Sequence, residues 1–273
     1  MPKQNTNVYE AIIEKIFTDR YKAGQTEILF DRDDIPAAAQ SLGLKIPANL
    51  GDVVSAYRFR KDMPQKIQST RPKGKRWIIR LIGRGKYCFA LVDDIDLSPN
   101  PNLMVTKIPD STPEIVKRYA MSDEQALLAI VRYNRLIDIF TGITCYSLQN
   151  HLRTTASGIG QVETDELYVG VDGRGINYAI PVQAKGGNDR LSVVQIEQDL
   201  AVCRDKKHLS EAICVPVAAQ FMSDGVVALF QFGEQAGKVV IIKECHYRLV
   251  AHDDISDEDL EQYKRLRTDD GKN

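Results

Sequence analysis

Two pairs of polar residues lie at alternate positions on neighbouring strand-like segments. Glu163 and Asp165 are two residues apart on the first segment, and Gln183 and Lys185 are two apart on the second. Side chains two apart on a strand point to the same face of a sheet. Carboxylate and amide oxygens are ligands of hard cations such as Mg²⁺. These residue types therefore suit a cation site with a lysine beside it.

The turn between the segments decides whether the two polar pairs share a face. The sequence Asp172-Gly173-Arg174-Gly175 is typical of a tight β-hairpin turn. If the loop is 173–175, Asp172 pairs with Ile176, and the numbers of all paired residues add up to 348. Asp165 then lies opposite Gln183, and Glu163 lies opposite Lys185. A loop one residue longer or shorter separates the faces.

The order Asp165, seventeen residues, then Gln183-Ala184-Lys185 resembles the motif of the PD-(D/E)XK nuclease superfamily. The resemblance covers roughly residues 120–220. Members of this superfamily include type II restriction endonucleases, junction resolvases and repair exonucleases. No proline precedes Asp165, and Gln183 replaces the usual acid. The replacement removes one negative charge from the site, which Glu163 or Glu166 would have to supply.

The resemblance implies a magnesium-dependent site for hydrolysis of phosphodiester bonds. Asp165, the Gln183 amide oxygen and the Ala184 carbonyl would hold Mg²⁺, with Glu163 as a further catalytic acid. Lys185 would position or deprotonate the attacking water and stabilise developing charge. Gln195 and Gln198, on the next helix, would face the active site or the DNA, or else form an exposed polar face. Asp138, or another acid on the helix expected at 122–140, would add a ligand.

Other catalytic motifs are missing from the sequence. It contains no P-loop, no dinucleotide-binding G-x-G-x-x-G and no G-x-S-x-G, and its four histidines have no ligand-spaced partners. The alternative interpretation of 160–187 is an ordinary solvated hairpin. Against it, Gln183 and Lys185 end an otherwise apolar segment, where an amide and an ammonium are costly unless they are used.

Positive charge is concentrated between Arg58 and Lys86. This stretch has eleven basic residues and one acid, a net charge of +10, whereas the whole chain carries −1. Lysines and arginines at this density neutralise DNA phosphates, and arginines read guanine edges. Arg58 and Arg60 are the candidates for base reading. The DNA-binding candidates in the stretch are Arg58, Arg60, Lys61, Lys73, Lys75, Arg76, Arg84 and Lys86.

The elements expected around the basic stretch follow the order of a winged helix-turn-helix. Periodicity and capping residues predict helices near 9–21, 35–42 and 50–57, and strands near 26–30, 77–82 and 86–92. Residues 1–95 are therefore predicted to be a winged-helix-like α+β domain. The proline-rich segment 96–118 is predicted to be a linker.

The remainder is predicted to be a mixed α/β domain over 119–255, a mixed sheet flanked by helices. Helices are expected at 122–140 and 191–207. Strands are expected near 151–155, 162–171, 176–184, 212–220, 226–232 and 239–244. Residues 256–273 are predicted to be a charged tail, either a solvated helix or a frayed end.

The composition predicts an intracellular, cytoplasmic protein. Five widely spaced cysteines without a C-x-x-C motif are typical of reduced, mostly buried thiols. No signal peptide or membrane span is expected.

Together these features predict a Mg²⁺-dependent type II site-specific deoxyribonuclease. Its N-terminal domain would bind double-stranded DNA, and its second domain would cut it, as a homodimer that cuts both strands. A repair or junction-resolving nuclease and a DNA-binding regulator with a degenerate nuclease domain remain as alternatives.

Overall fold

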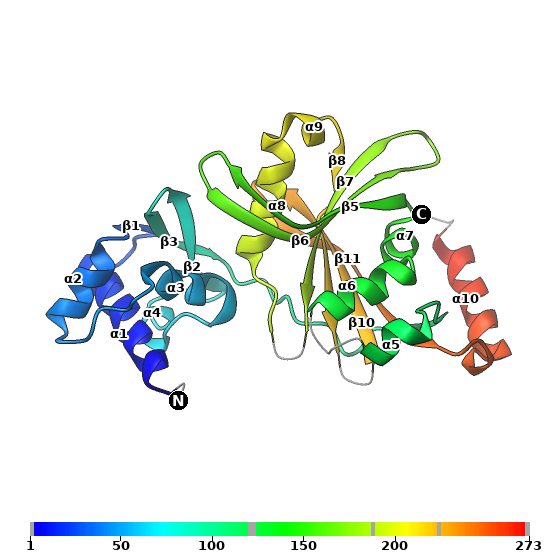
Figure 1. Ribbon diagram of the computed structural model, residues 1–273, viewed down its shortest axis with the longest axis horizontal. Helices are drawn as coiled ribbons and strands as arrows, with labels where there is room; N and C mark the ends of the chain where they lie inside the picture. Colours follow the sequence, from blue (N-terminus) through cyan, green and yellow to red (C-terminus); the bar gives the residue numbers. More distant parts are fainter. Residues whose placement is uncertain (1–2, 120–123, 187–188, 223–224, 271–273) are drawn as a thin grey trace. The chain divides into compact units, whose positions relative to one another are not determined.

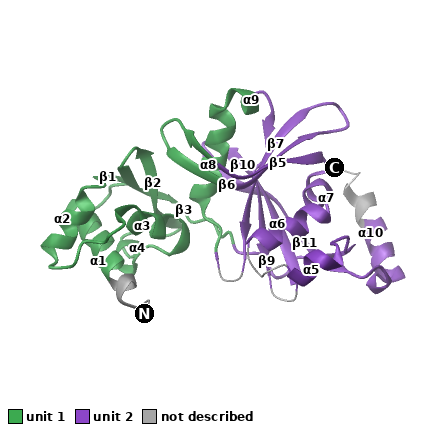
Figure 2. Ribbon diagram, in the orientation of Figure 1, with its two compact units in different colours: residues 1–97, 153–163, 190–210 green, residues 98–152, 164–189, 211–273 purple. Residues whose placement is uncertain are grey.

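The computed structural model describes residues 3–119, 124–186, 189–222 and 225–270 of the 273-residue chain (Figure 1). The chain divides into two compact units that are each built from several segments (Figure 2). The first unit comprises Met1–Leu97, Arg153–Glu163 and Arg190–Ser210, and the second comprises Ser98–Leu152, Thr164–Asp189 and Glu211–Asn273. The expected boundary at residue 95 lies close to the end of the first segment, but the two later segments of the first unit were not anticipated.

The N-terminal part of the first unit contains the predicted helices and strands in the predicted order. Its strands form a three-stranded antiparallel sheet in the order β1-β3-β2. Two short elements were not predicted, the π-helical turn η1 and the helix α4. The elements are α1 (Lys3–Arg20), β1 (Glu27–Asp31), α2 (Asp34–Ser41), α3 (Leu50–Ser55), η1 (Ala56–Arg60), α4 (Gln65–Gln68), β2 (Lys75–Gly83) and β3 (Lys86–Asp93).

Aromatic side chains fill the core of this part of the first unit. The ring of Phe17 on α1 packs edge-on against Trp77 on β2, at 5.1 Å between centroids, and against Phe89 on β3 at 5.2 Å. All three side chains are at most 2 % exposed. The helix α1 is thus fixed to the β2–β3 hairpin by burial of large apolar surface.

The remaining elements of the first unit come from later in the chain, namely the helices α8 (Val193–Asp205) and α9 (Lys207–Ser210) and the adjoining ends of two long strands. Arg80 on β2 binds Glu197 on α8 with two hydrogen bonds, one of them from Nε at 2.9 Å. Gly160, where one of these strands begins, lies so close to Leu81 that a Cβ atom there would be 2.7 Å from the Leu81 Cδ2.

The second unit is built on an eight-stranded mixed sheet flanked by helices, so the predicted α/β class is confirmed. The strand order is β4-β11-β10-β9-β7-β6-β5, and β8 pairs with β7. The elements are β4 (Val105–Pro109), α5 (Glu114–Tyr119), α6 (Glu124–Tyr133), α7 (Leu136–Thr141), β5 (Thr144–Ala156), β6 (Gly160–Val171), β7 (Asn177–Lys185), β8 (Ile213–Cys214), β9 (Val217–Phe221), β10 (Val226–Gln235), β11 (Lys238–Val250), a 3₁₀ turn (His252–Asp254) and α10 (Asp257–Asp270).

The predicted linker and tail are both part of the second unit. Within 96–118, β4 pairs in parallel with β11 at the edge of the sheet. The charged tail forms α10, which is held to β4 because Lys107 Nζ contacts Asp259 at 2.8 Å and the Lys107 N–H donates to the Tyr263 hydroxyl. Neither segment was predicted to pack against the sheet, because a short edge strand and a highly charged helix carry little apolar periodicity.

The helix expected at 122–140 is interrupted, and its first two residues lie outside the described part of the chain. Arg135 adopts a left-handed conformation (φ 50°), which separates α6 from α7. The preceding Asn134 is buried and accepts a hydrogen bond from the Ser111 N–H at 2.7 Å. Its amide also donates to Thr112 Oγ1 and to the Ile130 carbonyl. The break thus fastens α6 to the segment that follows β4.

The β6–β7 hairpin has the predicted register. Its pairs run from Val171–Asn177 to Glu166–Val182, so that the numbers of each pair add up to 348. Asp172 Oδ1 accepts hydrogen bonds from the Arg174 and Ile176 N–H groups, both at 2.9 Å, and its other oxygen accepts one from the Tyr178 hydroxyl. The turn 173–175 is therefore fixed by the side chain that precedes it.

Gly170 on β6 allows the sheet to pack closely at Ile143 and Thr144. A Cβ atom at Gly170 would lie 2.6 Å from Ile143 Cγ2 and 2.9 Å from the Thr144 carbonyl oxygen. Gly170→Ala should therefore lower the free energy of unfolding by about 1–3 kcal/mol, measured by urea denaturation. Gly173→Ala in the turn is the control, because a Cβ atom at Gly173 would have no other atom within 4 Å. Equal effects of the two substitutions would contradict this packing argument.

The described residues agree with two expectations from composition. All five cysteines are free, and Cys88, Cys145 and Cys203 are buried. Among the described helices, none is long and apolar enough to cross a membrane.

Candidate active site

The strand β7 presents Gln183 and Lys185 at the end of the central part of the sheet. It lies between β6 and β9, and Gln183 and Lys185 are only 0 % and 8 % exposed. Val182 and Ala184 face the apolar core that contains Leu127, Leu128 and Val131 of α6. Because side chains alternate along a strand, Gln183 and Lys185 point to the opposite face.

Asp165 contacts β7 through its side chain. Counted from the turn, the last main-chain pair of β6 and β7 is Glu166–Val182. Asp165 is the next residue of β6 beyond this pair. There, Asp165 Oδ2 accepts a hydrogen bond from the Ala184 N–H at 2.8 Å. The carboxylate thus lies against the backbone between Gln183 and Lys185. The predicted pairs Asp165–Gln183 and Glu163–Lys185 lie beyond the last main-chain pair. The Asp165 side chain still reaches the backbone between Gln183 and Lys185, whereas Glu163 binds Arg153 instead of lying opposite Lys185.

Lys185 is held by an acid that the sequence did not single out. Its Nζ lies 2.7 Å from Oε1 of Glu124, the first residue of α6. An acidic residue on the helix at 122–140 was anticipated, but Asp138 was the one named. Asp138 instead accepts a hydrogen bond from the Cys145 N–H at 2.9 Å and pairs with Arg135. It therefore fixes the connection between α7 and β5.

The environment of Asp165 opposes ionisation of its carboxyl group. Burial raises its pKa above the ordinary value of 3.8, and the nearby Glu124 acts in the same direction. The Ala184 N–H, Lys185 and His151 oppose this shift. A cation bound at Asp165 would favour the ionised form, so that metal binding would release a proton.

The raised pKa predicts the effect of Asp165→Asn on stability. Protonation of Asp165 stabilises the folded state below pH 3.8, and this stabilisation is lost as the pH rises through the folded-state pKa. Asparagine can still accept the Ala184 N–H and does not ionise. The melting temperature of Asp165→Asn, measured without metal, should therefore rise relative to wild type as the pH increases from 3.5 to 7, an interval set by the reference pKa of about 3.9.

Asp172→Asn is a control of opposite sign in the same hairpin. The Ile176 and Arg174 N–H groups lower the pKa of Asp172, with a smaller opposing effect of burial. Ionised Asp172 therefore stabilises the fold above its unfolded pKa, and its asparagine variant should lose stability relative to wild type over the same pH interval. If Asp165→Asn also lost stability relative to wild type as the pH rises, the argument that burial raises the pKa of Asp165 would be wrong.

The donor atoms at the end of β7 fit a hard cation. Asp165 and Glu124 supply carboxylates, Gln183 supplies an amide, and Ala184 supplies a main-chain carbonyl, all of which are oxygen ligands of the type that Mg²⁺ prefers. Among the described residues, no group of three or more His, Cys, Asp or Glu side chains is arranged to hold a metal ion. The contacts above place two acids, Asp165 and Glu124, at this end of β7, beside the neutral Gln183.

The other two acids of β6 lie elsewhere. Glu163 is exposed and binds Arg153 on β5, with Arg153 Nη2 3.0 Å from its Oε1. Glu166 is completely buried and accepts hydrogen bonds from Arg132 Nε at 3.0 Å and from Ser147. Glu166 therefore contacts α6 and β5.

Gln195 and Gln198 lie on α8, which forms at nearly the predicted residues and belongs to the first unit. Gln198 is 3 % exposed and the neighbouring Asp199 is completely buried. The alternative of an exposed polar face is therefore wrong for Gln198. Its Nε2 is buried without a hydrogen-bond partner in the described part of the chain. Asp199 is a buried acid that the sequence analysis missed.

The eight DNA-binding candidates of the basic stretch fall into three groups. Lys61, Lys73, Arg84 and Lys86 are exposed, and Arg84 and Lys86 lie at the turn of the β2–β3 hairpin. Three others form ion pairs. Arg60 pairs with Asp52, and Lys75 pairs with Asp93. Arg76 lies near both Asp62 and Asp94. Arg58 is 8 % exposed, which does not suit the predicted insertion of its side chain into a DNA groove.

Two functional candidates were missed because their positions depend on tertiary structure. Glu124 belongs to a helix whose start relative to β7 is not encoded in local periodicity. Gln220 on β9 is the parallel neighbour of Lys185, and Ala218 is the neighbour of Gln183. A polar residue at or next to the end of an apolar strand is the signal that both Gln220 and Lys185 share.

Comparisons with known proteins do not add to this assignment. No protein-family model, no curated protein and no solved structure matches the chain.

Proposed function

We propose that the protein is a Mg²⁺-dependent DNA endonuclease of the PD-(D/E)XK type, a type II restriction enzyme. The observation that carries this proposal is the contact of Asp165 with the Ala184 N–H, between Gln183 and a Lys185 that is held by Glu124. An acid thus contacts the backbone between an amide residue and a lysine at the end of a central strand. A solvated hairpin would not bury Gln183 and Lys185.

The residues at this site can divide the work of phosphodiester hydrolysis. A bound Mg²⁺ stabilises negative charge on the scissile phosphate and acidifies a bound water. Asp165 and Gln183 would hold the cation. One oxygen of Asp165 is already fixed by the Ala184 N–H. Lys185 would orient the attacking water and stabilise the charge that develops on the phosphate. Glu124 would position the Lys185 ammonium group.

The first unit supplies the charge for binding double-stranded DNA. Four exposed cations (Lys61, Lys73, Arg84 and Lys86) are not used in ion pairs within the described part of the chain. Exposed lysines and arginines bind phosphates with release of counterions. The hairpin β2–β3, which carries Arg84 and Lys86 at its turn, would serve as the wing of a winged helix-turn-helix. Cutting both strands in one binding event with one active site per chain takes two copies, so we propose a homodimer on DNA.

One feature of the site favours a second candidate function. Gln183 is neutral where the family carries an acid, so the site holds one negative charge fewer for Mg²⁺. A DNA-binding regulator without nuclease activity would have the same fold and the same basic first unit.

Incubation of the purified full chain with plasmid DNA and Mg²⁺ distinguishes these functions. A restriction enzyme produces discrete fragments, and a repair or junction-resolving enzyme makes structure-dependent nicks. Binding without cleavage in Mg²⁺ and in Mn²⁺ would refute the nuclease proposal and support the regulator. EDTA should abolish cleavage, because the proposed chemistry depends on the cation.

A further inference from the structure

The buried guanidinium group of Arg58 has two nitrogen atoms without a hydrogen-bond partner among the described residues. Arg58 is 8 % exposed, and its Nε and Nη2 atoms have no hydrogen-bond partner in the described part of the chain. It lies 4.5 Å from the ring centroid of Phe59, which gives it one cation–π contact. Burial lowers its pKa to about 10. Such a group is costly in a folded protein unless an anion pairs with it.

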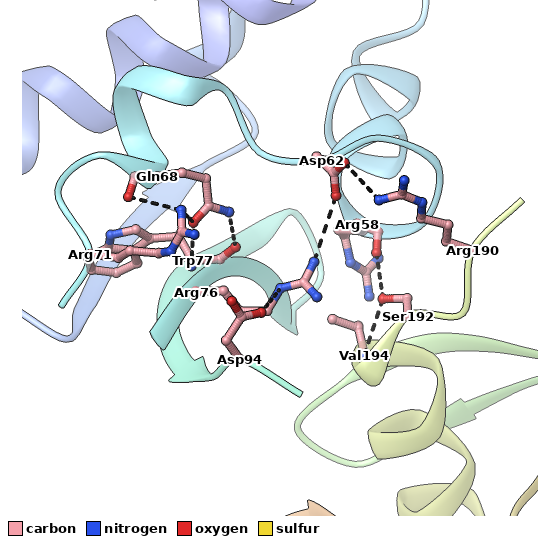
Figure 3. A network of polar contacts seen from close by, with 10 residues as sticks. All are labelled: Arg58, Asp62, Gln68, Arg71, Arg76, Trp77, Asp94, Arg190, Ser192 and Val194. Carbon is pink, nitrogen blue, oxygen red and sulfur yellow. Dashed lines mark hydrogen bonds and ion pairs between the residues drawn. The ribbon is translucent and has the colours of Figure 1, made fainter. Parts of the chain in front are cut away.

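The residues around Arg58 belong to the same unit and form a cationic cluster, which is shown in Figure 3. Arg76 lies 4.0 Å from Asp62 and 3.9 Å from Asp94, and Arg190 lies 3.3 Å from Asp62. Asp62 is thus shared by two arginines at distances longer than a good charge-assisted hydrogen bond. Three guanidinium groups face two carboxylates, which leaves one positive charge uncompensated.

The cluster lies at the N-terminus of the 13-residue helix α8. The N-cap residue Ser192 donates from its hydroxyl to the Arg58 carbonyl at 3.0 Å and accepts the Val194 N–H at 3.3 Å. Arg58 is therefore fixed beside the positive end of the α8 dipole, where anions are favoured. It also lies on the π-helical turn η1, a local irregularity that is frequent at functional sites.

We infer that Arg58, Arg76 and Arg190, at the N-terminus of α8, bind one phosphate group of the DNA backbone. A phosphodiester carries a single negative charge, which balances the charge left over in the cluster. The unpartnered edge of the Arg58 guanidinium suits two phosphate oxygens. The identity of the ligand as DNA rests on the proposed function, whereas the anion site follows from the cluster itself.

Thermal melting of the full chain tests the anion site without any nuclease activity. Inorganic phosphate, compared with chloride at equal ionic strength, should raise the melting temperature of the wild type. Arg58→Met should lose this rise and should melt at or above the wild-type temperature without phosphate, because it removes an unpaired buried charge. Arg71→Gln is the matched control, because its guanidinium is bound to Gln68 outside the cluster. It should keep the phosphate effect.

DNA affinity, measured without Mg²⁺ as a function of salt, tests whether the anion is a backbone phosphate. Arg58→Met and the exposed Arg190→Gln should weaken binding about tenfold or more and reduce the salt slope by about one. Arg190→Gln keeps the test valid if Arg58→Met does not fold. Unchanged DNA binding in a folded variant would overturn the inference, as would a wild type that does not respond to phosphate. Cleavage of plasmid by such a variant at the wild-type rate would leave the nuclease proposal standing on its own.

Discussion

Lys185→Ala should reduce the rate of DNA cleavage by at least about 100-fold, the usual effect of removing one group that stabilises transition-state charge. The structure provides the physical reason, because Glu124 holds the Lys185 ammonium beside the Asp165 carboxylate at the end of β7. No other lysine takes part in the contacts described at this site. The measurement is the rate of plasmid cleavage in Mg²⁺ under single-turnover conditions.

DNA binding separates a catalytic defect from a folding defect. Without metal, Lys185→Ala should bind DNA with the affinity of the wild type, and Lys185→Met should behave in the same way while keeping most of the buried side-chain volume. Lys15→Ala is the control, since Lys15 forms an exposed i,i+4 pair with Asp19 on α1. Cleavage by Lys185→Ala at the rate of Lys15→Ala would remove Lys185 from the mechanism.

The hairpin that carries the site could be predicted because its geometry is local. Asp172 and two glycines specify the turn, and a tight turn fixes the register of every pair in the two strands. Asp165 and Gln183 are therefore placed by residues near them in sequence. The same reasoning located α8, whose apolar spacing is a local signal.

The residues that complete the site could not be predicted because their positions depend on packing between distant segments. Glu124 and Lys185 are 61 positions apart in the chain. They meet only because α6 packs against β7. Arg58 was assigned to a DNA-recognition surface by its charge and by its place in the basic stretch, but it lies in the π-helical turn η1 and is buried. Edge strand β4 is specified by its parallel partner β11, which lies near the end of the chain.

Gln183→Glu should tighten Mg²⁺ binding on the order of tenfold, because affinity for hard cations increases with the number of charged oxygen ligands. Without metal, the same substitution should lower the melting temperature. It adds a second carboxylate beside Asp165 at a position that is 0 % exposed, where burial and like charge both oppose ionisation. Mg²⁺ should therefore raise the melting temperature of Gln183→Glu more than that of the wild type.

Gln183→Leu is the matched control, because it keeps a similar volume and removes the amide oxygen. It should respond less to Mg²⁺ than the wild type does. Ca²⁺ binding measured by calorimetry gives a second reading that does not depend on cleavage. If Mg²⁺ affects the wild type and both variants equally, Gln183 is not a ligand, and the cation must be held by Asp165 and Glu124 alone. A larger Mg²⁺ response in Gln183→Glu together with faster cleavage would instead show that the neutral amide limits the activity of the natural site.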